Sequence, residues 1–246
     1  MTNQDIVTAA FIIIGDEILS GRTVDANLNF LAKELTEIGI GLKEVRVVPD
    51  IEEEIILALS SLRKKFDYIF TSGGIGPTHD DITSLSIAKA FNEELIINKQ
   101  AVEILTHYYG QENLNIARLK MAHTPKSAKL LDNPVSSAPG FRIENVFVMA
   151  GVPKIFKAMF FAAKKELIGG KKVKSSEIRT ILTESIIAEQ LTDLQNKYLN
   201  ITIGSYPFDG GTSLIFRGIA YDDVDNAVNE MIKIINQIKP NAVISG

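Results

Sequence analysis

Short apolar runs alternate with amphipathic stretches along the first part of the chain. Val7–Ile14 is a nearly continuous apolar run, which is typical of a strand buried on both faces of a sheet. Residues 27–38 carry apolar side chains at the spacing of one helix face, and Gly39 follows as the predicted stop. The alternation continues with predicted strands at 42–48 and 67–71 and helices at 51–65 and 81–91. This order predicts an α/β sheet with right-handed crossovers and helices on both faces.

The middle of the chain has a less regular pattern. Helices are predicted at 100–109 and 114–122, and strands at 128–131 and 146–149. Pro153 is suited to the first turn of a helix, so a further helix is predicted from Pro153 to Leu167. Gly169 and Gly170 then indicate a hinge, which predicts a first domain at residues 1–170.

The order of predicted strands and helices changes after this hinge. Strands are predicted at 173–183, 201–206 and 212–220, and helices at 184–198 and 222–238. The last two strands are joined by a turn-rich connection, Pro207-Phe208-Asp209-Gly210-Gly211. We therefore expect a small α+β domain at 171–246, with two helices on one face of its sheet.

Composition narrows the class of protein. The chain has 246 residues, a formal net charge of −4 and no cysteine, which excludes disulfides, thiolate catalysis and cysteine zinc sites. The acidic excess argues against a nucleic-acid-binding protein, which usually carries a basic face. The amino terminus lacks the basic start of a secretory signal, and its apolar run is too short to span a bilayer. We expect a cytoplasmic protein that binds neither nucleic acid nor membrane.

Two loops concentrate the residues that can do chemistry. GDEILSG, at residues 15–21, follows the first predicted strand, and SGGIGPTHDD, at residues 72–81, follows the third. Ligands of open α/β sheets bind beyond the carboxyl ends of the strands. Because both loops leave such ends, the sequence predicts that they meet in one cleft.

The second loop has the composition of an anion site. Its glycines permit positive φ and close approach of the backbone to a ligand. Free amides, together with the start of the following helix, form a site for phosphate, and a hydroxyl can add a hydrogen bond. The predicted ligand-binding residues of this loop are Ser72, Gly73, Gly74, Gly76 and Thr78.

Acidic residues stand beside this predicted anion site. Asp80 and Asp81 would repel a phosphate unless a cation bridged them, which predicts Mg²⁺ or a similar hard ion that can also activate water. Asp16 and Glu17 of the first loop can complete the coordination or act as general base. The alternative, that the glycines form only a turn and that Asp80 or Asp81 caps a helix, stays open.

Basic residues add less specific signals. His79 lies inside the glycine loop, where it either contacts phosphate or points to solvent. Lys120 and Arg118 either neutralise a ligand phosphate or belong to a solvated helix face. The chain contains neither the GxSxG elbow of a serine hydrolase nor the GxxxxGK[ST] loop of P-loop proteins.

Several of these motifs carry a family resemblance. GDEILSG, SGGIGPTHDD, APGF and GVPKIFKAMF resemble the successive motifs of the molybdopterin-binding (MoaB/MogA-like) superfamily, over residues 6–167. In the tail, ESIIAE and IGSYP resemble the second domain of the CinA amino-terminal family. THDD, RLKMA and NPVSSAPGF are similar to the molybdopterin-binding-like domain of eukaryotic FAD synthetases.

This resemblance implies a fold and an activity. It implies a three-layer α/β domain and hydrolysis of a nucleotide diphosphate of the ADP-ribose or FAD type to two monophosphates, with Mg, Mn or Co as the divalent metal. It also suggests a homodimer. The residues that fall at the acidic metal and catalytic positions are Asp16, Glu17, Asp80 and Asp81. Two alternatives stay open: a module that binds a pterin or nucleotide phosphate without turnover, and a molybdopterin adenylyltransferase.

Overall fold

The structure, a computed structural model, describes residues 6–245 and divides into two compact units, Met1–Gly170 and Lys171–Gly246. The expectation of no secretory signal rests partly on residues 1–5, which lie outside the described residues. Among residues 6–245, no helix combines the length and the apolar character needed to cross a membrane.

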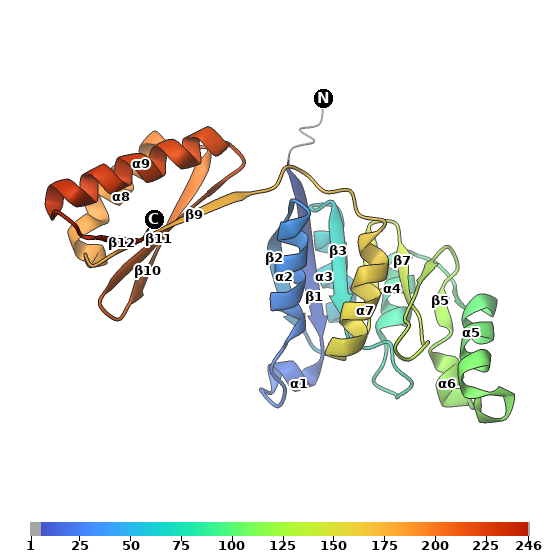
Figure 1. Cartoon of the computed structure of the whole chain (residues 1–246). Coiled ribbons are helices and arrows are strands. Elements are labelled where there is room, and N and C mark those ends of the chain that lie inside the picture. Colours follow the sequence, from blue (N-terminus) through green and yellow to red (C-terminus); the bar gives the residue numbers. More distant parts are fainter. Residues whose placement is uncertain (1–5, 246) are drawn as a thin grey trace. The chain divides into compact units, whose positions relative to one another are not determined.

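A six-stranded sheet forms the centre of the first unit, in the order β2-β1-β3-β8-β7-β6 (Figure 1). Four neighbouring strands are parallel, and β7 and β6 extend the sheet in antiparallel fashion. The strands are β1 Val7–Ile14, β2 Ile40–Val48, β3 Tyr68–Ser72, β6 Lys129–Leu131, β7 Gly140–Ile143 and β8 Val146–Met149. Both sides of β1 are buried, because its even- and odd-numbered residues pack into different cores. This explains the continuous apolar run.

Helices cover both faces of this sheet. In Figure 1, α2 (Asn27–Glu37) and α7 (Pro153–Lys164) lie in front of the sheet. Behind it lie α3 (Glu52–Leu62) and α4 (Thr83–Ala90). The front core includes Leu31, Leu35, Phe156 and Phe160, and the rear core includes Ile55, Leu59, Leu62 and Ile87. The predicted three-layer α/β fold is therefore confirmed.

A segment between α4 and β6 forms a side structure with a small core of its own. It contains β4 (Leu95–Ile97) paired with β5 (His123–Pro125), and between them α5 (Lys99–Tyr109), the 3-10 turn η1 (Gln111–Asn113) and α6 (Ile116–Lys120). Ala101, Leu105 and Ala122 are fully buried in its core. The sequence predicted both α-helices of this segment, but the two three-residue strands were not predicted.

Three local expectations were wrong. Ser72 is the last residue of β3 and does not open the loop that follows. Helix α4 begins at Thr83, with Ile82 at the cap position, and not at Asp81. No strand was predicted between residues 131 and 146, but Gly140 begins strand β7. A side chain at Gly140 would place Cβ 2.5 Å from the carbonyl oxygen of Val148, so this strand pairing requires glycine there.

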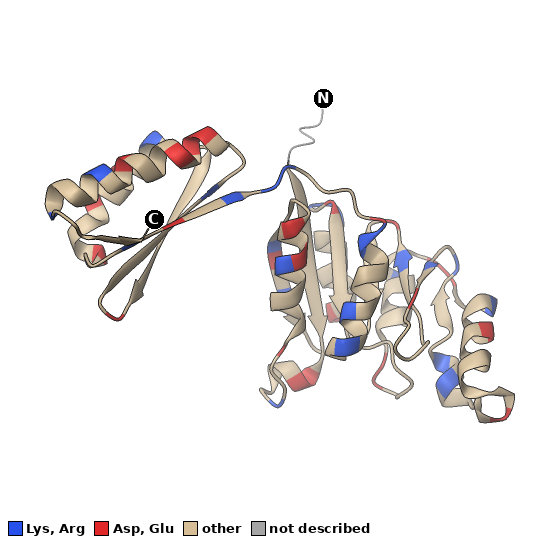
Figure 2. Ribbon diagram, in the orientation of Figure 1, with Lys and Arg blue, Asp and Glu red and all other residues tan. Residues whose placement is uncertain are grey.

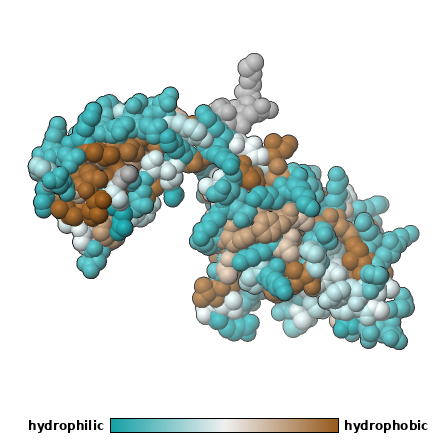
Figure 3. Space-filling model, in the orientation of Figure 1, coloured by the Kyte–Doolittle hydropathy of each residue, from teal (hydrophilic) through white to brown (hydrophobic). Residues whose placement is uncertain are grey.

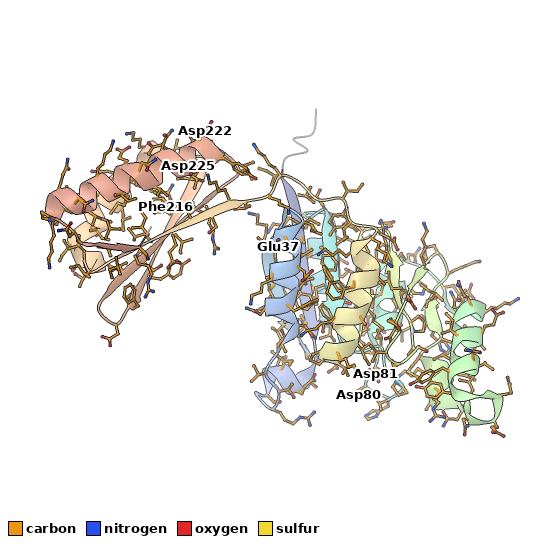
Figure 4. The ribbon with its side chains drawn as sticks, in the orientation of Figure 1. Glu37, Asp80, Asp81, Phe216, Asp222 and Asp225 are labelled. Carbon is orange, nitrogen blue, oxygen red and sulfur yellow. The ribbon has the colours of Figure 1, made fainter. Side chains whose placement is uncertain are left out.

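The second unit has the element order β-α-β-β-α-β, which is that of ferredoxin-like domains. Its elements are β9 (Lys174–Thr180), α8 (Glu184–Lys197), β10 (Ile201–Phe208), β11 (Gly211–Gly218), α9 (Tyr221–Ile238) and β12 (Val243–Ser245), and its sheet order is β10-β11-β9-β12. Phe216 of the sheet and Met231 of α9 are fully buried in one core, while Asp222 and Asp225 lie on α9 (Figure 4). The outward surface of α9 is mostly hydrophilic in Figure 3. The predicted α+β fold is confirmed, with β12 as an additional short strand.

Candidate functional site

A pocket of about 390 Å³ lies at the carboxyl edge of the main sheet. The segments that follow four parallel strands line it: Gly15 and Glu17 after β1, Asp50 after β2, residues 73–77 after β3, and residues 150–152 after β8. The two loops singled out in the sequence therefore meet in one cleft, as the alternation of strands and helices predicted.

Two consecutive glycines shape the floor of this pocket. Gly73 has a φ of +106° and Gly74 a φ of +68°, which is the region that favours glycine. A Cβ atom on Gly73 would lie 2.1 Å from the carbonyl oxygen of Ile14, and one on Gly74 would lie 2.1 Å from Oγ1 of Thr83. The loop after β3 thus runs directly against β1 and α4, and it can do so only without side chains at these positions.

A buried asparagine joins the loop after β3 to the loop after β8. Asn27, in the first turn of α2, is 2% exposed. Its Nδ2 donates to Ser72 Oγ at 2.9 Å and to the carbonyl oxygen of Gly151 at 2.8 Å. Gly151 packs so closely that a Cβ there would lie 3.3 Å from the Cα of Gly73. Asn27 was not predicted as a site residue from the sequence, because a polar residue at a helix start indicates only a cap.

Carboxylates from three strand ends face the same pocket. Glu17, Asp50 and Asp80 all line it, and Asp50 accepts a hydrogen bond from the backbone amide of Asp16 at 3.0 Å. Burial raises the pKa of Asp50, and the negative charges of Asp16, Glu17 and Asp80 raise it further. Figure 2 shows acidic residues on α1 (Asp16–Leu19) and on the loop between β3 and α4. The arrangement concentrates negative charge that a cation would stabilise.

Asp50 was missed in the sequence. It stands two residues after Val48, the last residue of β2, in a Val-Pro-Asp sequence without glycines. The usable signal was its position: it follows the carboxyl end of a parallel strand, as Glu17 and Gly73 do.

Asp80 and Asp81 lie next to each other on the loop between β3 and α4 (Figure 4), but they have different surroundings. Oδ2 of Asp81 accepts hydrogen bonds from the backbone amide of Thr78 at 2.8 Å and from its hydroxyl at 2.5 Å, so Asp81 closes the loop upon itself. The Asp80 side chain is 61% exposed. The nearby Thr78 is the largest of several influences that lower the pKa of Asp80, and the charges of His79 and Lys120 add to it. Neither aspartate is the cap residue of α4.

The remaining predicted residues lie outside the lining of the pocket. Nζ of Lys120 donates to the carbonyl oxygen of Thr78, so it fastens α6 to the glycine loop. The His79 side chain is 99% exposed, and the guanidinium of Arg118 stacks over the ring of Tyr109 at 4.2 Å. Of the residues predicted from the sequence, those that line the pocket are Glu17, Gly73, Gly74, Gly76, Asp80 and Asp81, and those outside it are Asp16, Ser72, Thr78 and Lys120.

Within residues 6–245, no three histidine, cysteine, aspartate or glutamate side chains stand close enough together to hold a metal ion by themselves. Mg²⁺ commonly takes one or two carboxylates from the protein and completes its shell with water and substrate phosphates. The separate carboxylates of Glu17, Asp50 and Asp80 around one pocket fit that kind of site and not a closed protein cage.

Comparisons with known proteins give consistent results. A family model described as a probable molybdopterin-binding domain matches residues 10–168, and one described as the middle domain of FAD synthase matches residues 172–242. A Pyrococcus furiosus protein is 38% identical over 214 residues, which are 81% of this chain and 84% of that protein. A probable FAD synthase of Caenorhabditis briggsae is 35% identical over 81% of this chain, but over only 43% of its own length. The crystal structure of a CinA protein of unknown function from Thermoplasma acidophilum is 37% identical, with a TM-score of 0.62, over 66% of this chain and 98% of that one.

Proposed function

The chain belongs to the family of probable molybdopterin-binding (MoaB/MogA-like) domains, and on this premise we propose that it hydrolyses a nucleotide diphosphate to two monophosphates with a divalent metal. One observation carries the proposal: a glycine loop and carboxylates from three strand ends converge on a single pocket. An anion-binding backbone and acidic side chains are compatible in one site when a cation lies between them.

The glycine loop binds the diphosphate in this proposal. The amide of Gly73 is already used, since it donates to the carbonyl oxygen of Met149 at 3.1 Å. The amides of residues 74–76 therefore carry the hydrogen bonds to phosphate oxygens. Asp81 keeps the loop closed through Thr78, and it acts by positioning these amides.

The carboxylates divide the chemistry between them. Asp50 and Asp80 would hold Mg²⁺, Mn²⁺ or Co²⁺ together with phosphate oxygens of the ligand, and the ion, when bound, neutralises the charge that builds on those oxygens. Glu17 lies over Gly15, since a Cβ there would come within 2.5 Å of Oε2 of Glu17. From this place Glu17 accepts a proton from the attacking water. The water oxygen bonds to one phosphorus, the bond from that phosphorus to the bridging oxygen breaks, and the other phosphate leaves with the electron pair.

The similarity to FAD synthases supports a dinucleotide or a nucleotide sugar as the substrate class. FAD would give AMP and FMN, and ADP-ribose would give AMP and ribose 5-phosphate. Both substrates contain the same diphosphate bridge, which is the group that the glycine loop would bind.

The test is a panel of nucleotide diphosphates, each incubated with Mg²⁺, Mn²⁺ or Co²⁺ and the purified chain, with products identified by mass spectrometry. Two monophosphates in equal amounts support the proposal. Binding of a nucleotide or pterin without products would favour a module without turnover. An adenylylated pterin with pyrophosphate would favour an adenylyltransferase.

A further inference from the structure

Strand β2 forms a long open edge of the main sheet. It stands at the end of the strand order and, within residues 6–245, it pairs with β1 alone (Figure 1). It has nine residues, whereas β6 at the opposite edge has three. A bulge at Lys43 interrupts its first half, but residues 44–48 pair regularly with β1. Such an edge presents unpaired backbone amides and carbonyls, to which another strand can add.

The two faces of this edge differ in chemistry. Val45 and Val47 lie on the side of the front core, where their neighbours on β1 are buried, but they are themselves 37% and 38% exposed. Glu44 and Arg46 lie on the side of the rear core. Nε and Nη2 of Arg46 donate to Oε1 of Glu44 at 2.9 and 2.7 Å. The edge is therefore apolar on its front face and carries one charge of each sign on its rear face.

We propose that β2 pairs with β2 of a second copy of the chain, antiparallel and with Val45 on the two-fold axis. Opposite residues of an antiparallel pair lie on the same face, so the pairing must be centred on one residue and not between two. A centre at Glu44 or Arg46 would place like charges opposite each other, which is destabilising. The centre at Val45 places Glu44 of each copy opposite Arg46 of the other. The four charges then alternate in sign on the rear face, and the two Val45 side chains meet on the front face.

This self-complementary pattern distinguishes β2 from the other long edge strand. Strand β10 of the second unit has eight residues, but it contains Pro207, which has no amide to donate, and no charged side chain. The inference is also independent of the proposed function, because none of the residues 40–48 lines the pocket. Since the two β2 strands would run in opposite directions, the two pockets would lie at opposite ends of the shared sheet.

Charge at the two-fold axis tests the interface. Val45→Arg and Val45→Glu each place like charges opposite each other, so each should raise the dissociation constant of the dimer about tenfold or more. An equimolar mixture of the two variants should form a dimer again, because opposite charges then meet at the axis. Leu57→Arg is the control: it adds the same charge at a residue that is 64% exposed, but on α3 and not on β2. Masses are measured by sedimentation equilibrium over a range of chain concentrations, and circular dichroism checks the fold of each variant.

Single cysteines test the register, because the chain contains no cysteine of its own. Val45→Cys would face its own copy, with Cα atoms about 4.5–5.5 Å apart, which is within the range of a disulfide. Val47→Cys is the matched control, on the same face of the same strand and equally exposed. It lies two residues from the axis, so its two copies would stand about 14 Å apart, too far for a disulfide. Mild oxidation should therefore cross-link Val45→Cys into a covalent dimer on a non-reducing gel and leave Val47→Cys as single chains.

Three results would overturn the inference. The first is a wild-type chain that stays monomeric at every concentration. The second is a dimer that persists in Val45→Arg, or one that is lost equally in Leu57→Arg, since either would place the interface elsewhere. The third is equal cross-linking of Val45→Cys and Val47→Cys, which would indicate random collision or another register. Loss of the dimer in both Val45 variants and its return in their mixture would support the pairing, whether or not the chain hydrolyses a diphosphate.

Discussion

Replacement of Asn27 tests how the pocket is held together. Asn27→Ala removes both hydrogen bonds that join Ser72 of β3 to Gly151 after β8. Each bond contributes about 1 kcal/mol net, and a buried acceptor left without a donor costs about 1–3 kcal/mol. The carbonyl oxygen of Gly151 loses this donor, whereas the hydroxyl of Ser72 can rotate toward other partners. We expect a loss of about 2–4 kcal/mol in the free energy of unfolding.

The chain offers a matched control at the opposite edge of the sheet. Nδ2 of Asn145, just before β8, donates to the carbonyl oxygens of Arg63 and Phe66 at 3.1 and 3.0 Å. Asn145→Ala therefore removes the same number of hydrogen bonds from the same residue type, far from the strand ends that form the pocket. Urea unfolding followed by far-UV circular dichroism should show midpoints lowered by a similar amount in both variants.

Ligand binding should separate the two variants. With Asn27 gone, the loops that carry Gly73 and Gly151 are free to move apart, and displacement of binding groups by a fraction of an ångström reduces affinity strongly. Asn27→Ala should bind pyrophosphate about tenfold more weakly, with Mg²⁺ present and under conditions in which both variants are folded. Asn145→Ala should bind it as the wild type does. Equal affinities in the two variants would refute the conclusion that Asn27 positions the anion loop.

Four further predictions follow from the acidic residues and the family resemblance. Because the pKa of Asp50 is raised in the folded chain, ionisation of this carboxyl destabilises the fold as pH rises through that pKa. Without metal, Asp50→Asn should therefore have a higher melting temperature than the wild type at pH 7, measured by calorimetry. The difference should disappear below pH ~4, where the carboxyl is protonated in both the folded and the unfolded chain. Asp80→Asn should lower turnover about 10²-fold with little change in melting temperature, whereas Asp222→Asn on α9 should change neither; an active Asp80→Asn would remove Asp80 from the chemistry. EDTA should stop hydrolysis, and added Mn²⁺ should restore it; activity that persists after exhaustive chelation contradicts the metal proposal. Light scattering should give twice the mass of the chain, as a homodimer requires, and a monomeric mass counts against it.

The sequence predicted the fold well where periodicity was long and strong. The continuous apolar run of Val7–Ile14 predicted a strand buried on both faces, and apolar residues at the spacing of one helix face predicted the helix that begins at Asn27. Both patterns can be recognised without knowledge of tertiary contacts. It failed where tertiary packing decides the conformation. Strand β7 begins at a glycine that is required by contact with Val148, and no local signal distinguishes such a glycine from one in a turn.

The candidate site was predicted in part for a similar reason. Glycines that follow a strand are visible in one sequence, so Gly73 and Gly74 were predicted to lie at the cleft, and both line the pocket. The pairing of Asp80 with Asp81 suggested one shared role, but Asp81 is occupied by hydrogen bonds within its own loop. Asp50 becomes significant only when β2 is placed beside β1, and that neighbourhood is a property of the sheet order.

The side structure from β4 to β5 has a consequence for local opening. Its own strand pair and the small core around Ala101, Leu105 and Ala122 allow it to unfold as a unit, at a lower free energy than the whole domain. Met121 belongs to this segment, and Gly74 belongs to the main sheet. A ligand that contacts both would join them, so its binding energy would oppose each opening event. Slower amide exchange and slower proteolytic cleavage in α5 and α6 would then report occupancy of the pocket from a distance.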